Sequence, residues 1–105
     1  MSHRIRVMIY AAAPQGSPDV VAQAYHRISE ELRGTPGLLG NELLSAIDDP
    51  DSFVVLSEWE SEEAFFAWES GPAHLQATAP LRPYQDRRSR GSFGISQVTA
   101  DYTTV

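Results

Sequence analysis

Three aromatic side chains in the middle of the sequence, those of Trp59, Phe65 and Trp68, are spaced to form the walls of a binding site for a flat molecule. An apolar run over residues 53–56 is too short for a helix and typical of a strand buried on both faces, and Trp59 lies at the end of this strand. Ser61 is a good helix N-cap, and after it Phe65 and Trp68 recur at helical spacing. A ligand held between this strand and this helix would contact Trp59, Phe65 or Trp68, although aromatic side chains more often serve a core.

Histidine is the best candidate for a general base, because an imidazole titrates near neutral pH and no carboxylate in the sequence is obviously desolvated. His74 follows Gly71 and Pro72, which interrupt the helix and free the side chain from the regular helical surface. His26 lies beside Tyr25 on the first predicted helix and could face the same site. Either histidine could remove a phenolic or enolic proton, and we prefer His74; a solvated histidine is the commoner alternative for each.

Other polar side chains could bind a substrate. Tyr10 and Asn41 lie on predicted strands and could reach a bound carbonyl, and Arg82 could pair with an anionic group at the mouth of a cavity. Such groups more commonly bond to the backbone or lie on a solvated loop, as do the arginines at residues 87–90. No metal site is expected, since the three histidines lack HxH or HxxxH spacing and the chain has no cysteine.

The bulk properties limit the class of protein. A chain of 105 residues, 42% of them hydrophobic, predicts a single domain over residues 1–105 with a modest core. The net charge of −6 argues against a nucleic-acid partner, since phosphate binding needs a positive surface. The apolar runs are far shorter than a membrane span and the N-terminal residues lack the apolar stretch of a signal peptide, so we expect no membrane association and a cytoplasmic location.

The hydrophobic pattern predicts four strands and two helices. Alternation marks a strand over residues 5–10, with Ile5, Val7 and Ile9 on one face. Ser17 as cap and Pro18 at the first helical position begin a helix that ends near residue 33. A second strand is predicted over residues 38–47, with Asn41, Leu43, Ser45 and Ile47 on one face, and a turn over 48–51 leads into a strand over 53–59. A helix from residue 61 is interrupted at 70–72 and resumes over 73–79 until Pro80 and Pro83 close it, and a loop over 84–91 leads to a strand over 92–100.

This order, βαββαβ, predicts an α+β fold of the ferredoxin-like type, in which a four-stranded antiparallel sheet carries two helices on one face. The segments at residues 7–10 and 53–56 are apolar on both faces, so the face away from the helices needs a cover. A second copy of the sheet is the economical cover, and we expect a homodimer packed sheet to sheet with Glu58 at the interface.

Several segments of the sequence carry the pattern of a known family. They are Thr35-Pro36-Gly37-Leu38-Leu39-Gly40, Asp48-Asp49-Pro50-Asp51-Ser52-Phe53, Glu58-Trp59-Glu60-Ser61-Glu62-Glu63-Ala64-Phe65, and Trp68-Glu69-Ser70 followed by His74. With these segments the chain resembles the antibiotic biosynthesis monooxygenase family, whose members form dimeric α+β barrels. The resemblance covers nearly the whole chain and is strongest over residues 35–75. It indicates the fold more specifically than the function, because one fold can carry several chemistries.

The resemblance implies three candidate activities. These are cofactor-free oxygenation of aromatic polyketides, in which the substrate's own phenolate or enolate gives the electron to oxygen, a related oxidation of quinols, and oxidative degradation of haem. In family members that oxidise anthrones, a tryptophan at the strand end works with an asparagine and a tyrosine. Trp59 matches that tryptophan, but Val55 and Phe65 stand at the other two positions, so the resemblance to this site is partial.

The match to the haem-degrading members is weaker. Trp68 matches a tryptophan that these members carry in the second helix. They also need an asparagine on the first strand, where this chain offers Ile9 or Tyr10, and a histidine where this chain has Ala77 or Thr78. Haem degradation is therefore not the expected activity.

The leading hypothesis is a small cofactor-independent monooxygenase or oxidase. It would act with molecular oxygen on a small aromatic substrate, a polyketide-derived phenol, anthrone or quinol, in secondary-metabolite biosynthesis. We expect the purified protein to be colourless and to bind neither haem nor flavin, since no phosphate-cradling glycine motif is present. The alternatives are a polyketide cyclase-like helper and a non-catalytic dimeric ligand-binding protein on the same fold.

Overall fold

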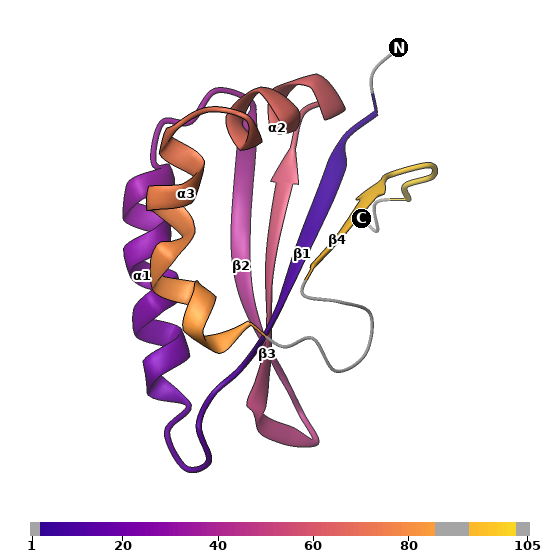
Figure 1. The fold of residues 1–105 in the computed structure, drawn as a ribbon. Helices are drawn as coiled ribbons and strands as arrows, with labels where there is room; N and C mark the ends of the chain where they lie inside the picture. The colour runs from indigo at the N-terminus through magenta and orange to yellow at the C-terminus, as the bar shows by residue number, and fades with distance from the viewer. Residues whose placement is uncertain (1–2, 86–92, 103–105) are drawn as a thin grey trace.

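A computed structural model describes residues 3–85 and 93–102. Its elements follow the predicted ferredoxin-like order (Figure 1), and the four strands form one antiparallel sheet in the order β2-β3-β1-β4. In chain order they are β1 (Ile5–Ala12), α1 (Asp19–Leu32), β2 (Leu38–Ala46), β3 (Asp49–Trp59), α2 (Glu62–Glu69), α3 (Ala73–Thr78), a 3-10 helix η1 (Ala79–Tyr84) and β4 (Phe93–Gln97).

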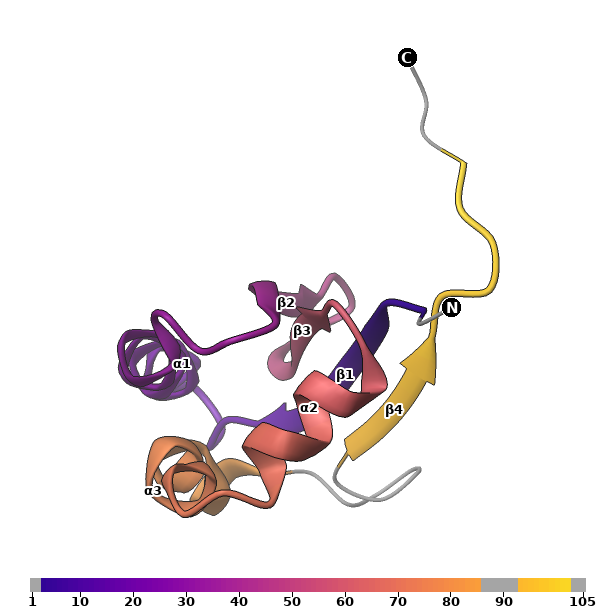
Figure 2. The same cartoon turned by 90° about the horizontal axis from the view of Figure 1, so that it is seen from above.

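The molecule has two layers, with all the helices on the same side of a curved sheet (Figure 2). Strand alternation decides which side chains meet the helices. On β1, Ile5 and Val7 are buried on this inner face, while Arg6 between them is exposed. The register pairs Ile5 with Trp59 of β3, so the inner face of the sheet carries the buried indole directly beside β1.

In the part of the chain that the structure describes, no helix covers the outer face of the sheet. It carries apolar side chains at adjacent register positions, namely Met8, Tyr10, Leu44, Val54 and Leu56. Near the end of β3, Glu58 accepts a hydrogen bond from Arg6 and forms an ion pair with Arg4 at 3.6 Å. The homodimer that would cover this face, with Glu58 at its interface, stays a prediction.

The hairpin between β2 and β3 is tighter than predicted. The expected turn over residues 48–51 is wrong, because β2 ends at Ala46 and pairs there with Asp49, which leaves only Ile47 and Asp48 as the loop. Ile47 was predicted to be the last residue of the strand, but it lies in this loop and is fully exposed.

One of the two predicted helix N-caps is confirmed and the other is wrong. Ser61 caps α2 as expected, its hydroxyl accepting a hydrogen bond from the backbone N–H of Ala64 at 3.1 Å. The cap assigned to Ser17 is wrong: Pro18 occupies the N-cap position of α1, and Ser17 offers only its backbone oxygen, to Val20.

The second predicted helix is broken at residues 70–72, as expected, into α2 and α3. Pro80 and Pro83 do not close α3 but lie within η1, whose tighter turn continues the chain to Tyr84. Gln85 then forms an isolated bridge with Ala11, while the rest of the predicted loop, with Arg87, Arg88 and Arg90, lies outside the described residues. β4 is shorter than the predicted strand over 92–100.

The core consists of two clusters under the helices. The larger joins α1 to the sheet and to η1 through residues such as Val21, Ile28, Val55 and Leu81, and the smaller joins Ile5, Val7, Trp59 and Phe65. Among the described residues, no helix has both the length and the apolar character needed to cross a bilayer.

Candidate active site

A cavity of about 210 Å³ lies between the inner face of the sheet and the helices. Its walls are mostly apolar and come from β1, α1, β2, β3, α2, α3 and η1. The cavity is smaller than the roughly 300–1,000 Å³ typical of pockets for drug-sized ligands, which favours a compact ligand. The polar residues that line it are Tyr25, Ser29, Asn41, Ser57, Glu69, His74, Thr78, Arg82 and Gln85.

One wall of the cavity is formed by the aromatic side chains of Trp59 at the end of β3 and of Phe65 and Trp68 in α2, as predicted from their spacing. Trp59 is only 1% exposed, and its ring centroid lies 5.4 Å from that of Phe65 and 5.3 Å from that of Trp68. Trp59 therefore packs in the core and also lines the cavity, the two positions considered for it from the sequence. Edge-to-face and tilted ring pairs of this kind hold one another in place, which makes this wall rigid.

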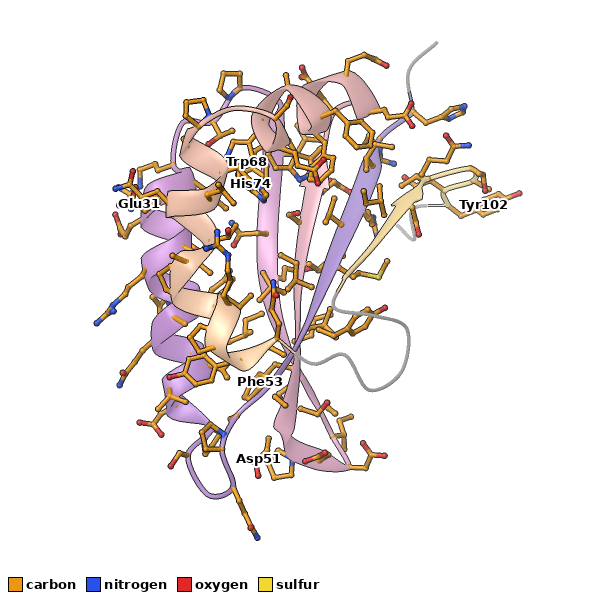
Figure 3. The ribbon with its side chains drawn as sticks, in the orientation of Figure 1. Glu31, Asp51, Phe53, Trp68, His74 and Tyr102 are labelled. Atoms are coloured by element: carbon orange, nitrogen blue, oxygen red, sulfur yellow. The ribbon has the colours of Figure 1, made fainter. Side chains whose placement is uncertain are left out.

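His74 lies at the cavity beside this wall. Its ring centroid is 4.7 Å from that of Trp68, with the two rings at 72° to each other. Figure 3 shows these two side chains together between the helices and the sheet, at the opposite end of the sheet from Asp51 in the β2–β3 hairpin. Within the described part of the chain, the imidazole has no hydrogen bond or ion pair. Both of its ring nitrogens are thus available to a ligand.

The break after α2 explains this placement. Gly71 and Pro72 separate α2 from α3, and the backbone N–H of His74 bonds to the Gly71 carbonyl in the new first turn. The backbone oxygen of His74 accepts a hydrogen bond from the Thr78 hydroxyl at 2.9 Å, which fixes the short helix that carries the imidazole.

Arg82 also lines the cavity, and it is exposed, which places it at the mouth. Its guanidinium donates hydrogen bonds to the backbone oxygen of Leu75 and to the Thr78 hydroxyl. Among the described residues it has no carboxylate partner, so its charge remains available to an anionic group of a ligand.

Asn41 lines the cavity from β2, and α1 holds its side chain. Its Oδ1 atom accepts hydrogen bonds from the hydroxyls of Tyr25, at 2.5 Å, and of Ser29, at 3.3 Å. The side chain is therefore fixed across the gap between helix and sheet.

Two predicted site residues lie elsewhere. Tyr10 is on the outer face of the sheet, where it pairs with Val54, because side chains alternate along β1 and Ile9 faces inward. His26 is exposed on α1, where its ring contacts that of Tyr25. One step along a helix turns the next side chain by about 100°, so His26 does not share the direction of Tyr25. Neither residue lines the cavity.

Six polar residues that line the cavity were not predicted as site residues, namely Tyr25, Ser29, Ser57, Glu69, Thr78 and Gln85. Tyr25 and Ser29 are four residues apart, a spacing that places both on one face of α1, and this was the available signal. Ser57 stands two positions before Trp59, on the same side of β3, and its hydroxyl accepts a hydrogen bond from the indole N–H of Trp59 at 2.9 Å.

Comparisons with known proteins agree with this architecture. The model of the antibiotic biosynthesis monooxygenase family matches residues 4–80. Protein SchA of Streptomyces halstedii is 30% identical over 98 residues, which are 93% of this chain and 26% of SchA. The chain thus spans about a quarter of the length of that relative.

Two further proteins are similar. A heme oxygenase (mycobilin-producing) of Mycobacterium tuberculosis is 38% identical over 61 residues, 57% of each chain. The crystal structure of SnoaB, a cofactor-independent oxygenase from Streptomyces nogalater, superposes with a TM-score of 0.72 at 20% identity and covers 98% of this chain and 97% of SnoaB. At that identity the likeness shows a shared fold.

Proposed function

Because the chain belongs to the antibiotic biosynthesis monooxygenase family, we propose that it is a small oxygenase that acts without a cofactor on an aromatic phenol, anthrone or quinol in secondary-metabolite biosynthesis. One observation carries the proposal. An apolar cavity walled by Trp59 and Trp68 contains an imidazole, that of His74, which has no partner within the described residues. Apolar surroundings, a flat aromatic wall and a free base are what such a reaction requires.

In this mechanism the substrate is the reductant. Its ring lies against Trp59 and Trp68, and His74 removes a proton from the phenolic or enolic oxygen. The resulting anion gives an electron to molecular oxygen, and a carbon–oxygen bond then forms between the two radicals. The protonated imidazole returns its proton to the peroxide formed on the ring carbon, and loss of water, which breaks the O–O bond and the remaining C–H bond, leaves one oxygen atom as a carbonyl. An anthrone methylene thus becomes a quinone carbonyl with no outside electron donor. The enclosed apolar walls favour this sequence by keeping bulk water from the anion.

Arg82 and Asn41 would orient the substrate. Arg82, at the mouth, can pair with an anionic substituent, and Asn41 can donate to an oxygen deeper in the cavity. The volume of about 210 Å³ favours a compact fused-ring substrate over a long polycyclic one.

The two histidines give a matched test. Oxygen uptake is measured on a panel of anthrones, naphthoquinols and phenols, and the His74→Ala and His26→Ala variants are compared on a substrate that the wild type consumes. Loss of a general base costs about 10²–10⁴ in rate, so His74→Ala should be severely impaired. His26→Ala should keep the wild-type rate, because this imidazole lies outside the cavity. A His74→Ala variant with wild-type activity would remove His74 from the mechanism. Binding of panel compounds without any oxygen uptake would instead favour the cyclase-like helper or the non-catalytic binding protein.

Haem degradation is the second candidate, favoured by the 38% identity to the heme oxygenase. The residues present fit a haem poorly. The cavity of about 210 Å³ favours a compact ligand over a macrocycle, and the positions that the resemblance assigns to a haem-binding histidine hold Ala77 and Thr78, of which Ala77 is a buried core residue. Titration with haemin separates the candidates, since a saturable shift of the Soret absorption that depends on His74 would support haem binding.

A further inference from the structure

A second polar group lines the cavity on the side of the sheet and takes no part in removing the proton. It consists of Asn41 on β2 and Ser57 on β3, which are register partners in the antiparallel pair. Side chains directly opposite each other in such a pair have their Cβ atoms about 4.5–5.5 Å apart. One ligand atom can therefore contact both side chains at once.

The hydrogen bonds already made by these two residues determine what they can offer a ligand. The Oδ1 atom of Asn41 accepts from Tyr25 and Ser29, and the Oγ atom of Ser57 accepts from the Trp59 indole. The polar hydrogens that remain are the two amide N–H groups of Asn41 and the hydroxyl hydrogen of Ser57. Within residues 3–85 and 93–102, none of these donors has an acceptor. The pair thus presents donors, and its acceptor atoms are already engaged by the protein.

We propose that Asn41 and Ser57 together bind the substrate oxygen that becomes negatively charged when its proton is removed, as an oxyanion hole on the sheet. Fixed donors in a poorly solvated site stabilise a developing negative charge much more than donors in water do. This inference rests on the proposed function for the identity of the reacting group, a phenolic or enolic oxygen. It identifies the substrate as one that is bound through an ionised ring oxygen, facing β2 and β3.

Tyr25 and Ser29 are positioning residues in this arrangement. Both come from α1, and the Tyr25 hydroxyl also lies 3.3 Å from the backbone oxygen of Asn41. By holding Oδ1 toward α1, they prevent the amide from rotating its oxygen toward the substrate anion, which would repel it. Arg82 is the rival anion site, but it is exposed at the mouth and its guanidinium is already bonded to Leu75 and Thr78.

The experiment measures the ionisation of a bound phenol and does not depend on turnover. The probe is 4-nitrophenol, whose ionised form has its own absorption band, and the matched neutral probe is 4-nitrotoluene, which lacks the oxygen. In the wild type, the pKa of bound 4-nitrophenol should lie below that of the free compound. The neutral variant Asn41→Leu should bind the ionised probe about 10–100-fold more weakly, because a hydrogen bond to a charged group is lost. Its affinity for 4-nitrotoluene should not change.

Further variants separate the donors from their supports. Asn41→Asp keeps an acceptor for Tyr25 and Ser29 but replaces the donors by a negative charge, so it should weaken binding of the ionised probe more than Asn41→Leu does. Tyr25→Phe should raise the pKa of the bound probe, by less than Asn41→Leu does, while the control Tyr10→Phe on the outer face should leave it unchanged. Circular dichroism of every variant shows whether the fold is kept.

The results have distinct meanings. If Asn41→Leu leaves the pKa of bound 4-nitrophenol at its wild-type value, or weakens both probes equally, the assignment of Asn41 is overturned. If the wild type binds no 4-nitrophenol, or binds it with an unchanged pKa, the oxyanion hole is overturned as a whole. If binding of the ionised probe depends on Asn41 but no panel substrate consumes oxygen, the inference stands and the proposed oxygenase activity fails.

Discussion

Gly37 lies between α1 and β2 and packs against the start of α2, so its replacement by alanine tests how closely this connection approaches α2. The residue has φ of +84°, and an added Cβ atom would lie 2.4 Å from the Cβ atom of Ala64 in α2 and 3.4 Å from the Cγ atom of Glu60. Gly34, in the same connection, has φ of +80° but no atom within 4 Å of the added position. Both glycines therefore have a positive φ that disfavours a side chain, but only at Gly37 would an added Cβ atom collide with another residue.

The expected losses follow from this difference. A side chain in the left-handed region costs about 1–2 kcal/mol in either variant. Overpacking against a helix costs about 1–3 kcal/mol more. We therefore expect Gly34→Ala to lose about 1–2 kcal/mol of unfolding free energy and Gly37→Ala about 2–5 kcal/mol. Any gain from a stiffer unfolded chain is the same in both and cancels in the comparison.

Urea unfolding at a fixed protein concentration, followed by the fluorescence of Trp59 and Trp68, measures both variants. The fixed concentration matters because association of subunits would shift the apparent stability. Equal losses for Gly34→Ala and Gly37→Ala would refute the close approach between Gly37 and Ala64. The Gly37→Ala variant should also bind aromatic ligands more weakly than the wild type, because Phe65 and Trp68 move with the displaced α2.

Two other changes test the site and the outer face. Trp59→Phe should keep the fold but lose about 1–3 kcal/mol of unfolding free energy, since it leaves a gap at a residue only 1% exposed. It should also weaken the binding of aromatic ligands. Urea unfolding measures the stability and ligand titration measures the affinity, and a variant in which both are unchanged would contradict the described packing. Leu56→Arg places a charge in the middle of the outer face and should convert a dimer to monomers in sedimentation velocity, whereas Ile47→Arg at the hairpin tip should not. A wild-type protein that sediments as a monomer at micromolar concentration would refute the predicted dimer.

The part of the site that comes from one continuous stretch could be predicted from the sequence. Trp59, Phe65, Trp68 and His74 lie within sixteen residues, and their arrangement follows from a strand end, a serine cap and a glycine–proline break, all of them local signals. The alternation of the first strand also predicts where Tyr10 lies, because it places Tyr10 on the other face of the strand from Ile9.

The rest of the site depends on pairing between distant segments. Asn41 meets Ser57 only through the register of β2 on β3, and it meets Tyr25 only because α1 packs across that part of the sheet. Nothing in the neighbouring residues specifies either contact. The same limit explains the wrong prediction for His26. The rotation of α1 about its axis decides whether residue 25 or residue 26 faces the cavity, and packing against the sheet sets this rotation.

The break between α2 and α3 divides the cavity wall into two parts with different dependence on the core. Trp59 and Phe65 are buried core residues, so substitutions there change stability and binding together. His74 and Arg82 are carried by a six-residue helix and the 3-10 turn after it, and neither side chain belongs to either core cluster. Descendants of one ancestral protein can therefore exchange the groups at these two positions without unfolding the sheet. A lineage with this fold can thus diverge through one short segment while the buried aromatic wall of Trp59 and Phe65 is retained.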